Sequence, residues 1–195
     1  MKYLEIRPRL DTGDIVLFSG ESFVSKIIKW GTKSNWSHVG MVIKIPVWDF
    51  VLLFESTTLN TLLDLTTDRP VKGVQIVPLS HRISTYEGQI GIRLLQIERT
   101  KKMLEDLTAF CVEMRGVPYE KNKIELLKAA YDGWLGENKE NLSSVACSEV
   151  LAAGFKRCRV LNDRQASNER TPEDFSSNAL GLPFSEIFMM DKKGP

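Results

Sequence analysis

Three side chains of this sequence, Cys147, His38 and Glu55, are of the types that together form a nucleophilic site. A cysteine thiolate attacks carbonyl carbon, an imidazole acts as its base, and a carboxylate beside the imidazole fixes the tautomer and stabilises the charged form. The chain has only two histidines, His38 and His81, so a histidine-dependent mechanism has few candidates. Such a site would cleave or transfer an acyl group held as an amide or ester.

The spacing of His38 and Glu55 fits a β-hairpin. His38 precedes an apolar, β-branched run that ends at Ile45, and Glu55 follows a second run that begins at Phe50. A two-residue turn would set His38 opposite Glu55, and a four-residue turn would make them diagonal neighbours on one face. In both cases they would be about 5 to 8 Å apart. A three-residue turn would put them on opposite faces, and a surface pair at a strand end is the alternative interpretation.

Cys147 lies in a segment, residues 142–150, that is expected to begin a helix. Ser143 or Ser144 could cap this helix, which would place Cys147 in its first turn. There the free backbone N–H groups and the helix dipole favour a thiolate, and the same N–H groups could donate to an oxyanion. A nearby imidazolium lowers a thiol pKa from about 8.5 into roughly the 3.5 to 7.5 range.

The other two cysteines have no such surroundings. Cys111 shares an apolar helical stripe with Met103, Leu107 and Phe110, so we expect it to be a core residue. Cys158 has no partner pattern and is given no role. A buried, unreactive thiol is also the alternative interpretation of Cys147.

Signatures of other chemistries are missing from the sequence. It contains no Gly-x-Ser-x-Gly nucleophile motif, no phosphate-binding glycine-rich loop and no Cys/His spacing typical of zinc. We therefore expect no cofactor and no metal. His81 follows an apolar run without a nearby carboxylate and is interpreted as a loop residue.

The elements that must position these residues change in type along the chain. Apolar runs with β propensity dominate the first half, and i, i+3, i+4 spacing dominates the second, which predicts an α+β domain. The expected strands are residues 15–18, 39–45, 50–54, 74–79 and 90–97. The expected helices are 23–30, 103–114, 124–131 and 144–153, the last closed by Gly154, with another helix start at 171–175.

Length and composition indicate one domain, residues 1–195, with the last 15 or so residues peripheral. A net charge of +1, from 26 basic and 25 acidic side chains, gives no reason to expect a nucleic-acid partner. Three cysteines do not make a disulfide framework. No signal peptide or run of about 18 apolar residues is present, so we expect a cytoplasmic protein without a transmembrane segment.

Several motifs, taken in this order, resemble the circularly permuted NlpC-type papain-like cysteine hydrolases. This branch includes the bacterial YiiX-like proteins, and lecithin:retinol acyltransferase and poxvirus proteins are relatives. The motifs are GDIVLF (13–18), SHVGMV (37–42), FES (54–56), KGVQIVPL (72–79), GVPY (116–119) and ACSE (146–149). In ordinary papain-like enzymes the cysteine helix precedes the histidine strand, whereas here His38 and Glu55 come first, as in the permuted branch.

The resemblance implies a papain-like fold in which a small antiparallel sheet carrying His38 and Glu55 packs against a helix carrying Cys147. It also implies a thiol hydrolase or acyltransferase that forms a thioester acyl-enzyme, and it places Tyr119 at the edge of the site as a substrate-binding residue. Peptides, N-acyl amides and lipid esters stay open as substrates. The alternative function is a catalytically silent papain-like binding module. The insert 57–69 and the tail after 163 have no counterpart in the family.

Overall fold

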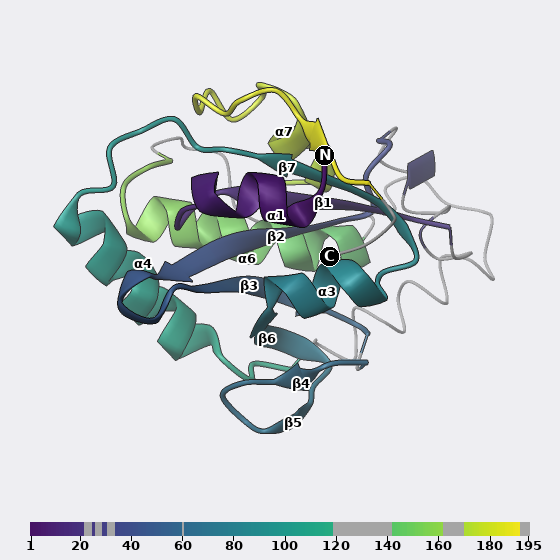
Figure 1. Ribbon diagram of the computed structural model, residues 1–195, viewed down its shortest axis with the longest axis horizontal. Coiled ribbons are helices and arrows are strands. Elements are labelled where there is room, and N and C mark those ends of the chain that lie inside the picture. Colours follow the sequence, from purple (N-terminus) through teal and green to yellow (C-terminus); the bar gives the residue numbers. More distant parts are fainter. Residues whose placement is uncertain are drawn as a thin grey trace.

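An antiparallel sheet of six strands, in the order β6-β3-β2-β1-β7-β8, runs through the middle of the molecule (Figure 1). The computed structural model describes residues 1–21, 25, 29, 30, 34–59, 61–118, 142–161 and 170–191, with the backbone alone over 142–146. The strands of the sheet are β1 (Ile15–Gly20), β2 (His38–Ile45), β3 (Phe50–Thr57), β6 (Gly73–Pro78), β7 (Gly88–Arg93) and β8 (Phe188–Met189).

Helices cover both faces of this sheet. The helices are α1 (Tyr3–Ile6), α3 (Leu79–Thr85), α4 (Lys101–Met114), α6 (Leu142–Arg157) and α7 (Pro172–Ser176), with 3-10 turns η1 (Arg7–Arg9) and η2 (Pro46–Trp48). Two short strands, β4 (Leu63–Asp64) and β5 (Arg69–Pro70), form a separate hairpin within the insert. The α+β fold predicted from the sequence is confirmed.

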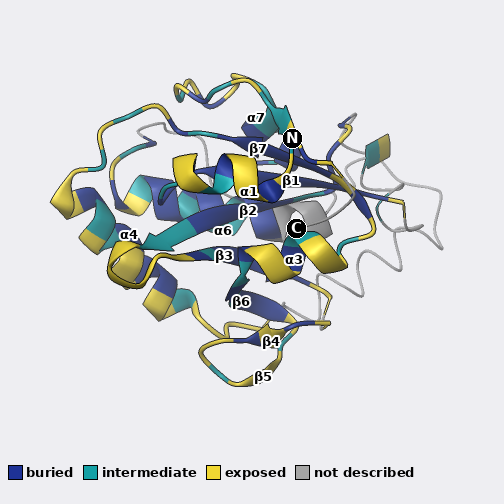
Figure 2. Cartoon of the chain, in the orientation of Figure 1, coloured by how far each residue is buried: buried dark blue, intermediate teal, exposed yellow. Residues whose placement is uncertain are grey.

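The alternation of side chains along β1 separates two hydrophobic cores. Ile15 and Leu17 face the core that α4, α6 and α7 complete, whereas Val16 and Phe18 face the core that α1 and α3 complete. Every residue of β1 is buried, and the strand is dark blue along its length in Figure 2. A central strand with both faces covered explains why its sequence is an uninterrupted apolar run.

The predicted hairpin forms with a four-residue connection, residues 46–49. Ile45 pairs with Phe50 and Met41 with Phe54, and Asp49 closes the turn in the left-handed conformation with φ of 50°. In this register His38 and Glu55 are diagonal neighbours on one face, as expected for a four-residue turn. They share this face with Phe18, which pairs with His38 across β1 and β2.

The two strands of this hairpin part before they reach the end that carries His38. Their backbone pairing stops at Met41 and Phe54, after which β2 continues against β1 alone and β3 against β6 alone. In Figure 1, helix α6 is visible behind the place where β2 and β3 diverge. His38 and Glu55 therefore lie on segments of β2 and β3 that are not paired with each other, and their side chains meet across this gap in the pairing.

Helix α6 is longer than predicted, because Gly154 does not end it. A Cβ atom at Gly154 would lie 3.1 Å from Cδ1 and Cε1 of Phe110 on α4. The glycine therefore allows α4 and α6 to approach closely within the core. The prediction that Gly154 terminates the helix is wrong, because a packing glycine has the same sequence signal as the glycine that commonly follows a helix end.

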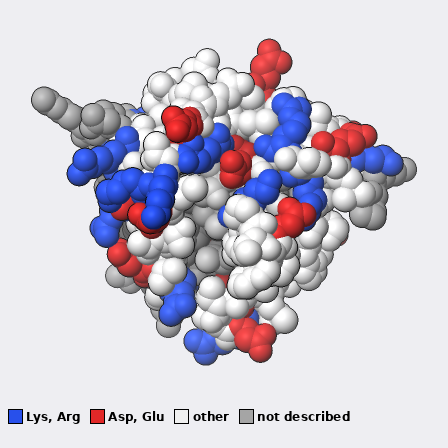
Figure 3. Space-filling model, turned by 60° about the vertical axis from the view of Figure 1, so that its left-hand side comes forward, with Lys and Arg blue, Asp and Glu red and all other residues white. Residues whose placement is uncertain are grey.

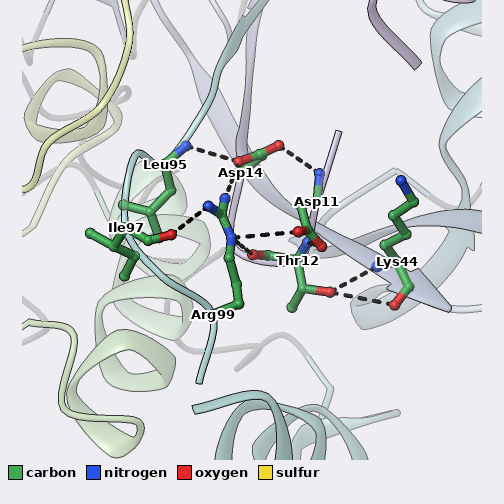
Figure 4. A network of polar contacts seen from close by, with 7 residues as sticks. All are labelled: Asp11, Thr12, Asp14, Lys44, Leu95, Ile97 and Arg99. Atoms are coloured by element: carbon green, nitrogen blue, oxygen red, sulfur yellow. Dashed lines mark hydrogen bonds and ion pairs between the residues drawn. The ribbon is translucent and has the colours of Figure 1, made fainter. Parts of the chain in front are cut away.

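Asp14, from the GDIVLF motif, fixes the start of β1 (Figure 4). Its Oδ1 accepts hydrogen bonds from the Leu95 backbone and the Arg99 guanidinium, both at 2.8 Å, and its Oδ2 accepts one from the Asp11 backbone at 2.7 Å. Strand β7 ends at Arg93, opposite the first residue of β1, and not near residue 97 as predicted; beyond it the Leu95 amide donates to Asp14. Burial raises the pKa of Asp14 to about 6 despite these donors.

The last described residues are less peripheral than expected. Strand β8 extends the sheet by pairing with β7, Phe184 packs in the α6 side of the core and Met190 in the other core. Apolar side chains in this segment explain its attachment, since they bury surface on both sides of the sheet edge.

On the face drawn in Figure 3, acidic and basic side chains are interspersed, so this surface has no large patch of one charge.

The insert folds back onto β6, because Asp64 accepts a hydrogen bond from the Ile76 backbone at 2.7 Å. Among the described helices, none is both long and apolar enough to cross a bilayer.

Candidate active site

The side chains of His38 and Glu55 meet at the end of the sheet where β2 and β3 part. Nε2 of His38 lies 2.6 Å from Oε2 of Glu55. Glu55 is fully buried, whereas the His38 side chain retains 15% exposure and contacts the Phe18 ring, with centroids 5.4 Å apart. The imidazole is therefore oriented by a carboxylate on one side and an aromatic ring on another.

Glu55 has two further partners that were not predicted from the sequence. Gln75, opposite Glu55 on β6, donates from Nε2 to Oε1 of Glu55 at 2.7 Å. Arg82, on α3, donates from Nη2 to Oε2 of Glu55 at 3.3 Å. Its Nε lies 3.2 Å from Oε1 as an ion pair without hydrogen-bond alignment. The carboxylate is thus held from three elements.

These contacts decide the charge of Glu55. Burial alone would raise its pKa, but the Arg82 charge and the hydrogen bonds from His38 and Gln75 outweigh burial and lower the pKa to about 2. Glu55 is consequently an anion throughout the pH range in which proteins are handled. An anion at this position favours the protonated form of the imidazole that it contacts.

Cys147 lies against the same imidazole. A side-chain hydrogen bond and an electrostatic interaction join Cys147 to His38, whose Nε2 also contacts Glu55. Burial would lower the pKa of His38, but the interactions with Cys147 and then with Glu55 raise it to about 9. The three residues singled out in the sequence thus form one continuous chain of contacts, from sulfur through imidazole to carboxylate.

The position of Cys147 within its helix differs from the expected one. Helix α6 begins at Leu142, so Cys147 lies in the second turn and not the first. In that position its own backbone N–H belongs to the helical ladder and is not one of the free N–H groups of a helix start. The expectation that Cys147 lies in the first turn, beside free N–H groups that could donate to an oxyanion, is therefore wrong.

All three cysteines are buried. Cys147 has 0% exposure, and Cys111 and Cys158 lie in the core cluster around α4 and α6. Burial raises the pKa of Cys111 to about 12 and also raises the pKa of Cys158. The prediction that Cys111 is a core residue is confirmed, and both of these thiols are poor nucleophiles.

Two other residues named from the sequence do not join the site. His81 lies on α3 and is exposed, so its interpretation as a loop residue is wrong. Tyr119, the expected substrate-binding residue, lies outside the described residues, as does the helix expected over 124–131.

The two partners of Glu55 that were not predicted, Gln75 and Arg82, differ in whether the sequence marks them. Gln75 is a polar residue between Val74 and Ile76 in an otherwise apolar strand, and such an interruption could have marked it. Arg82 carried no signal, because its approach to Glu55 depends on how α3 packs across β3. A contact between residues 27 positions apart has no local pattern.

The donor set suits acid–base and nucleophilic chemistry better than metal binding. Within the described residues, no group of three or more His, Cys, Asp and Glu side chains could hold a metal ion. Both oxygens of Glu55 already contact donors, and one of these donors is a guanidinium, whose positive charge disfavours a metal cation at the same carboxylate.

Comparison with solved structures finds the same fold. The crystal structure of the metalloprotein yiiX from Escherichia coli O157:H7, DUF1105, superposes with a TM-score of 0.53 at 18% sequence identity, over 95% of this chain and 98% of that one. No protein-family profile matches the sequence, and no curated protein matches it closely enough to count as a relative. The fold predicted from the motifs is confirmed: the chain has the α+β, papain-like fold of the YiiX structure.

Proposed function

We propose that this protein is a cysteine-dependent hydrolase or acyltransferase that acts on an amide or ester through a thioester on Cys147. The observation that carries the proposal is the continuous contact of Cys147 with His38 and of His38 with Glu55, at 2.6 Å in the second case. This order of thiol, imidazole and carboxylate supplies a nucleophile, a proton carrier and a group that orients the carrier.

The proposed reaction has two halves. In the first, Sγ of Cys147 bonds to the carbonyl carbon, the bond to the leaving amine or alcohol breaks, and His38 gives its proton to that leaving group. In the second, water or another acceptor gives a proton to His38 and bonds to the same carbon, and the carbon–sulfur bond breaks. Hydrolysis and acyl transfer differ only in which acceptor enters second.

We assign no metal to the site, although the YiiX protein from Escherichia coli is described as a metalloprotein. In this chain the surroundings of Glu55, with Arg82 beside it, do not fit a metal ligand, and no step is routed through a metal. Peptides, N-acyl amides and lipid esters remain the substrate classes, all of which present the carbonyl that the thiol requires.

One observation favours a second candidate, a catalytically silent binding module of the same fold. Cys147 has no exposed surface in the described structure, and a nucleophile must be reached by its substrate. In a silent module the pair His38–Glu55 would serve stability, and Cys147 would never carry an acyl group.

The test is to find the covalent intermediate. The protein is incubated with a panel of activated acyl amides and esters, quenched rapidly in acid and weighed by intact-mass spectrometry. We expect an added acyl mass that hydroxylamine removes, that maps to Cys147 and that is absent from Cys147→Ser. Turnover by Cys147→Ser at the wild-type rate would exclude the covalent route, and the absence of both adduct and turnover with every probe would favour the binding module.

A further inference from the structure

Arg82 is buried against the carboxylate of the candidate active site. Its side chain is 3% exposed and lies within 3.3 Å of both oxygens of Glu55. The guanidinium is also close to two aromatic rings, 5.3 Å from the Phe18 centroid and 5.5 Å from the Tyr86 centroid. Phe18 is the ring that contacts His38, so Arg82 and the imidazole share one aromatic neighbour.

The need for such a cation follows from the proton cycle of the proposed reaction. His38 must lose its proton to the leaving group and regain it from the acceptor. When the imidazole is neutral, a carboxylate with no other partner would be an unpaired anion in a buried site, which is strongly unfavourable. The carboxylate would then take up the proton itself or turn toward water, and in both cases the imidazole would lose its partner.

Arg82 removes this difficulty because a guanidinium keeps its charge at every accessible pH. Glu55 interacts with His38 of β2, Gln75 of β6 and Arg82 of α3. Tyr86, which follows α3, also interacts electrostatically with Glu55, and Cys147 of α6 interacts with His38. Gln75 and Tyr86 are neutral, and His38 and Cys147 change charge during the cycle. Among these groups, Arg82 alone carries a permanent positive charge.

We propose that Arg82 is a positioning residue that keeps Glu55 ionised and in place while His38 gains and loses its proton. This inference rests on the proposed function for its purpose, but the contacts that support it do not depend on any substrate. Arg82 touches no reacting atom and acts only through Glu55.

Two substitutions of Arg82 separate the effect of its charge from the effect of its packing. Arg82→Met keeps an unbranched apolar stem and removes the charge, and Arg82→Lys keeps the charge without the planar fork. Arg93→Met is the matched control, because Arg93 is also buried and lies 5.2 Å from the centroid of an aromatic ring, that of Phe184. Arg93 binds neutral carbonyl oxygens and lies on β7 opposite Ile15, at the end of β1 away from His38.

Two readouts report on the site without a substrate. One is the NMR titration of the His38 ring, for which exposed His81, the other histidine of the chain, is an internal reference. The other is the pH dependence of Cys147 alkylation by iodoacetamide, mapped by mass spectrometry. In Arg82→Met we expect the His38 midpoint to fall by at least about one pH unit, the low end for loss of a charge partner. The pH at which Cys147 alkylation reaches half of its maximal rate on the acid side should rise. Arg82→Lys should restore most of both midpoints, that of His38 titration and that of Cys147 alkylation.

A merely structural Arg82 predicts a different pattern. Arg82→Met would then lower thermal stability, as Arg93→Met does, and leave the His38 midpoint unchanged. An unchanged or raised His38 midpoint in folded Arg82→Met overturns the inference, since it would mean that Glu55 stays ionised and in place unaided. If wild-type Cys147 shows no preferential alkylation at any pH, the proposed function fails, but the His38 titration still decides the role of Arg82.

The double variant Glu55→Gln/Arg82→Met covers the case in which Arg82→Met does not fold. It removes the anion together with the cation, so no unpaired charge is buried, and we expect it to be more stable than either single variant. Stability losses that simply add in the double variant would show that Arg82 acts by packing between the rings, and would overturn the inference.

Discussion

At the scale of single residues, the three cysteines differ in whether a charged group lies beside the thiol. Cys147 contacts an imidazole whose pKa is raised to about 9, so the positive charge is present at neutral pH. Cys111, in contrast, lies in an apolar core that raises its pKa to about 12. The same residue type therefore has an imidazolium beside it on α6 and no such charge on α4.

This contrast predicts selective modification. Iodoacetamide at pH 6 should label Cys147 before Cys111 and Cys158, because only Cys147 has a cation to stabilise its thiolate. Full burial should make the reaction slow, and the ranking of the three sites is the measured outcome. In His38→Ala the preference should fall by about 10²-fold or more, the low end for loss of a catalytic acid–base group. Faster labelling of Cys111 or Cys158 in the wild-type protein would contradict the prediction.

At the scale of elements, helix α6, which carries Cys147, packs against α4, β2 and β3. Gly154 lies two turns beyond Cys147, at the point where Phe110 of α4 meets α6. In an isolated helix, glycine costs roughly 0.5–1 kcal/mol relative to alanine, so propensity alone favours replacing it. The packing argues the other way, since Phe110 is buried and also contacts Phe54 of β3.

We expect the packing cost to outweigh the gain in helix propensity when Gly154 is replaced by alanine. Gly154→Ala should lower the free energy of unfolding by about 1 kcal/mol, because overpacking costs typically 1–3 kcal/mol and exceeds the gain in propensity. Urea unfolding measures the change. Phe110→Leu should lessen the effect of Gly154→Ala, since leucine leaves room for the added methyl group. A more stable Gly154→Ala protein would contradict this prediction, since it would show that α4 shifts to accommodate the added methyl group without a loss of stability.

The elements also show how far the sequence could predict the structure. The hairpin was predictable because two apolar runs and a proline-containing turn restrict β2 and β3 to a few registers, of which the four-residue turn is the one observed. The start of α6 was not, since Ser143 and Ser144 are equally good caps one or two residues inside the observed helix. The contact of Arg82 with Glu55 depends on packing between α3 and β3, which leaves no periodic signal in the sequence.

At the scale of the whole molecule, buried ionisable groups make stability depend on pH. The pKa of Glu55 falls from 4.5 to about 2 on folding, so its contribution is present above pH 4.5 and is lost as the pH falls through about 2. The pKa of His38 rises from 6.5 to about 9, so its contribution is present below pH 6.5 and is lost as the pH rises through about 9. Asp14 has a raised pKa of about 6, and its contribution, present below pH 3.8, is lost as the pH rises through about 6.

Glu55→Gln should isolate the first two contributions. Around pH 5 to 7 we expect this variant to lose about 3–5 kcal/mol of unfolding free energy, because Arg82 is left as an uncompensated buried charge. The difference from wild type should narrow at pH 3 and again at pH 9. Glu113→Gln is the control, because Glu113 forms an ion pair of similar length with Arg157, 3.2 Å, but on the surface. A constant difference for Glu55→Gln from pH 3 to pH 9 would contradict the assigned pKa shifts.

The parting of β2 and β3 couples the protonation of the site to the mechanics of the sheet. Among the described residues beyond Met41 and Phe54, no backbone ladder joins the half of the sheet containing β1 and β2 to the half containing β3 and β6. The contact between His38 and Glu55 bridges these halves, and it strengthens when the imidazole is charged. Each proton that leaves His38 therefore weakens this link, so the stiffness of this end of the sheet and the charge of the imidazole vary together.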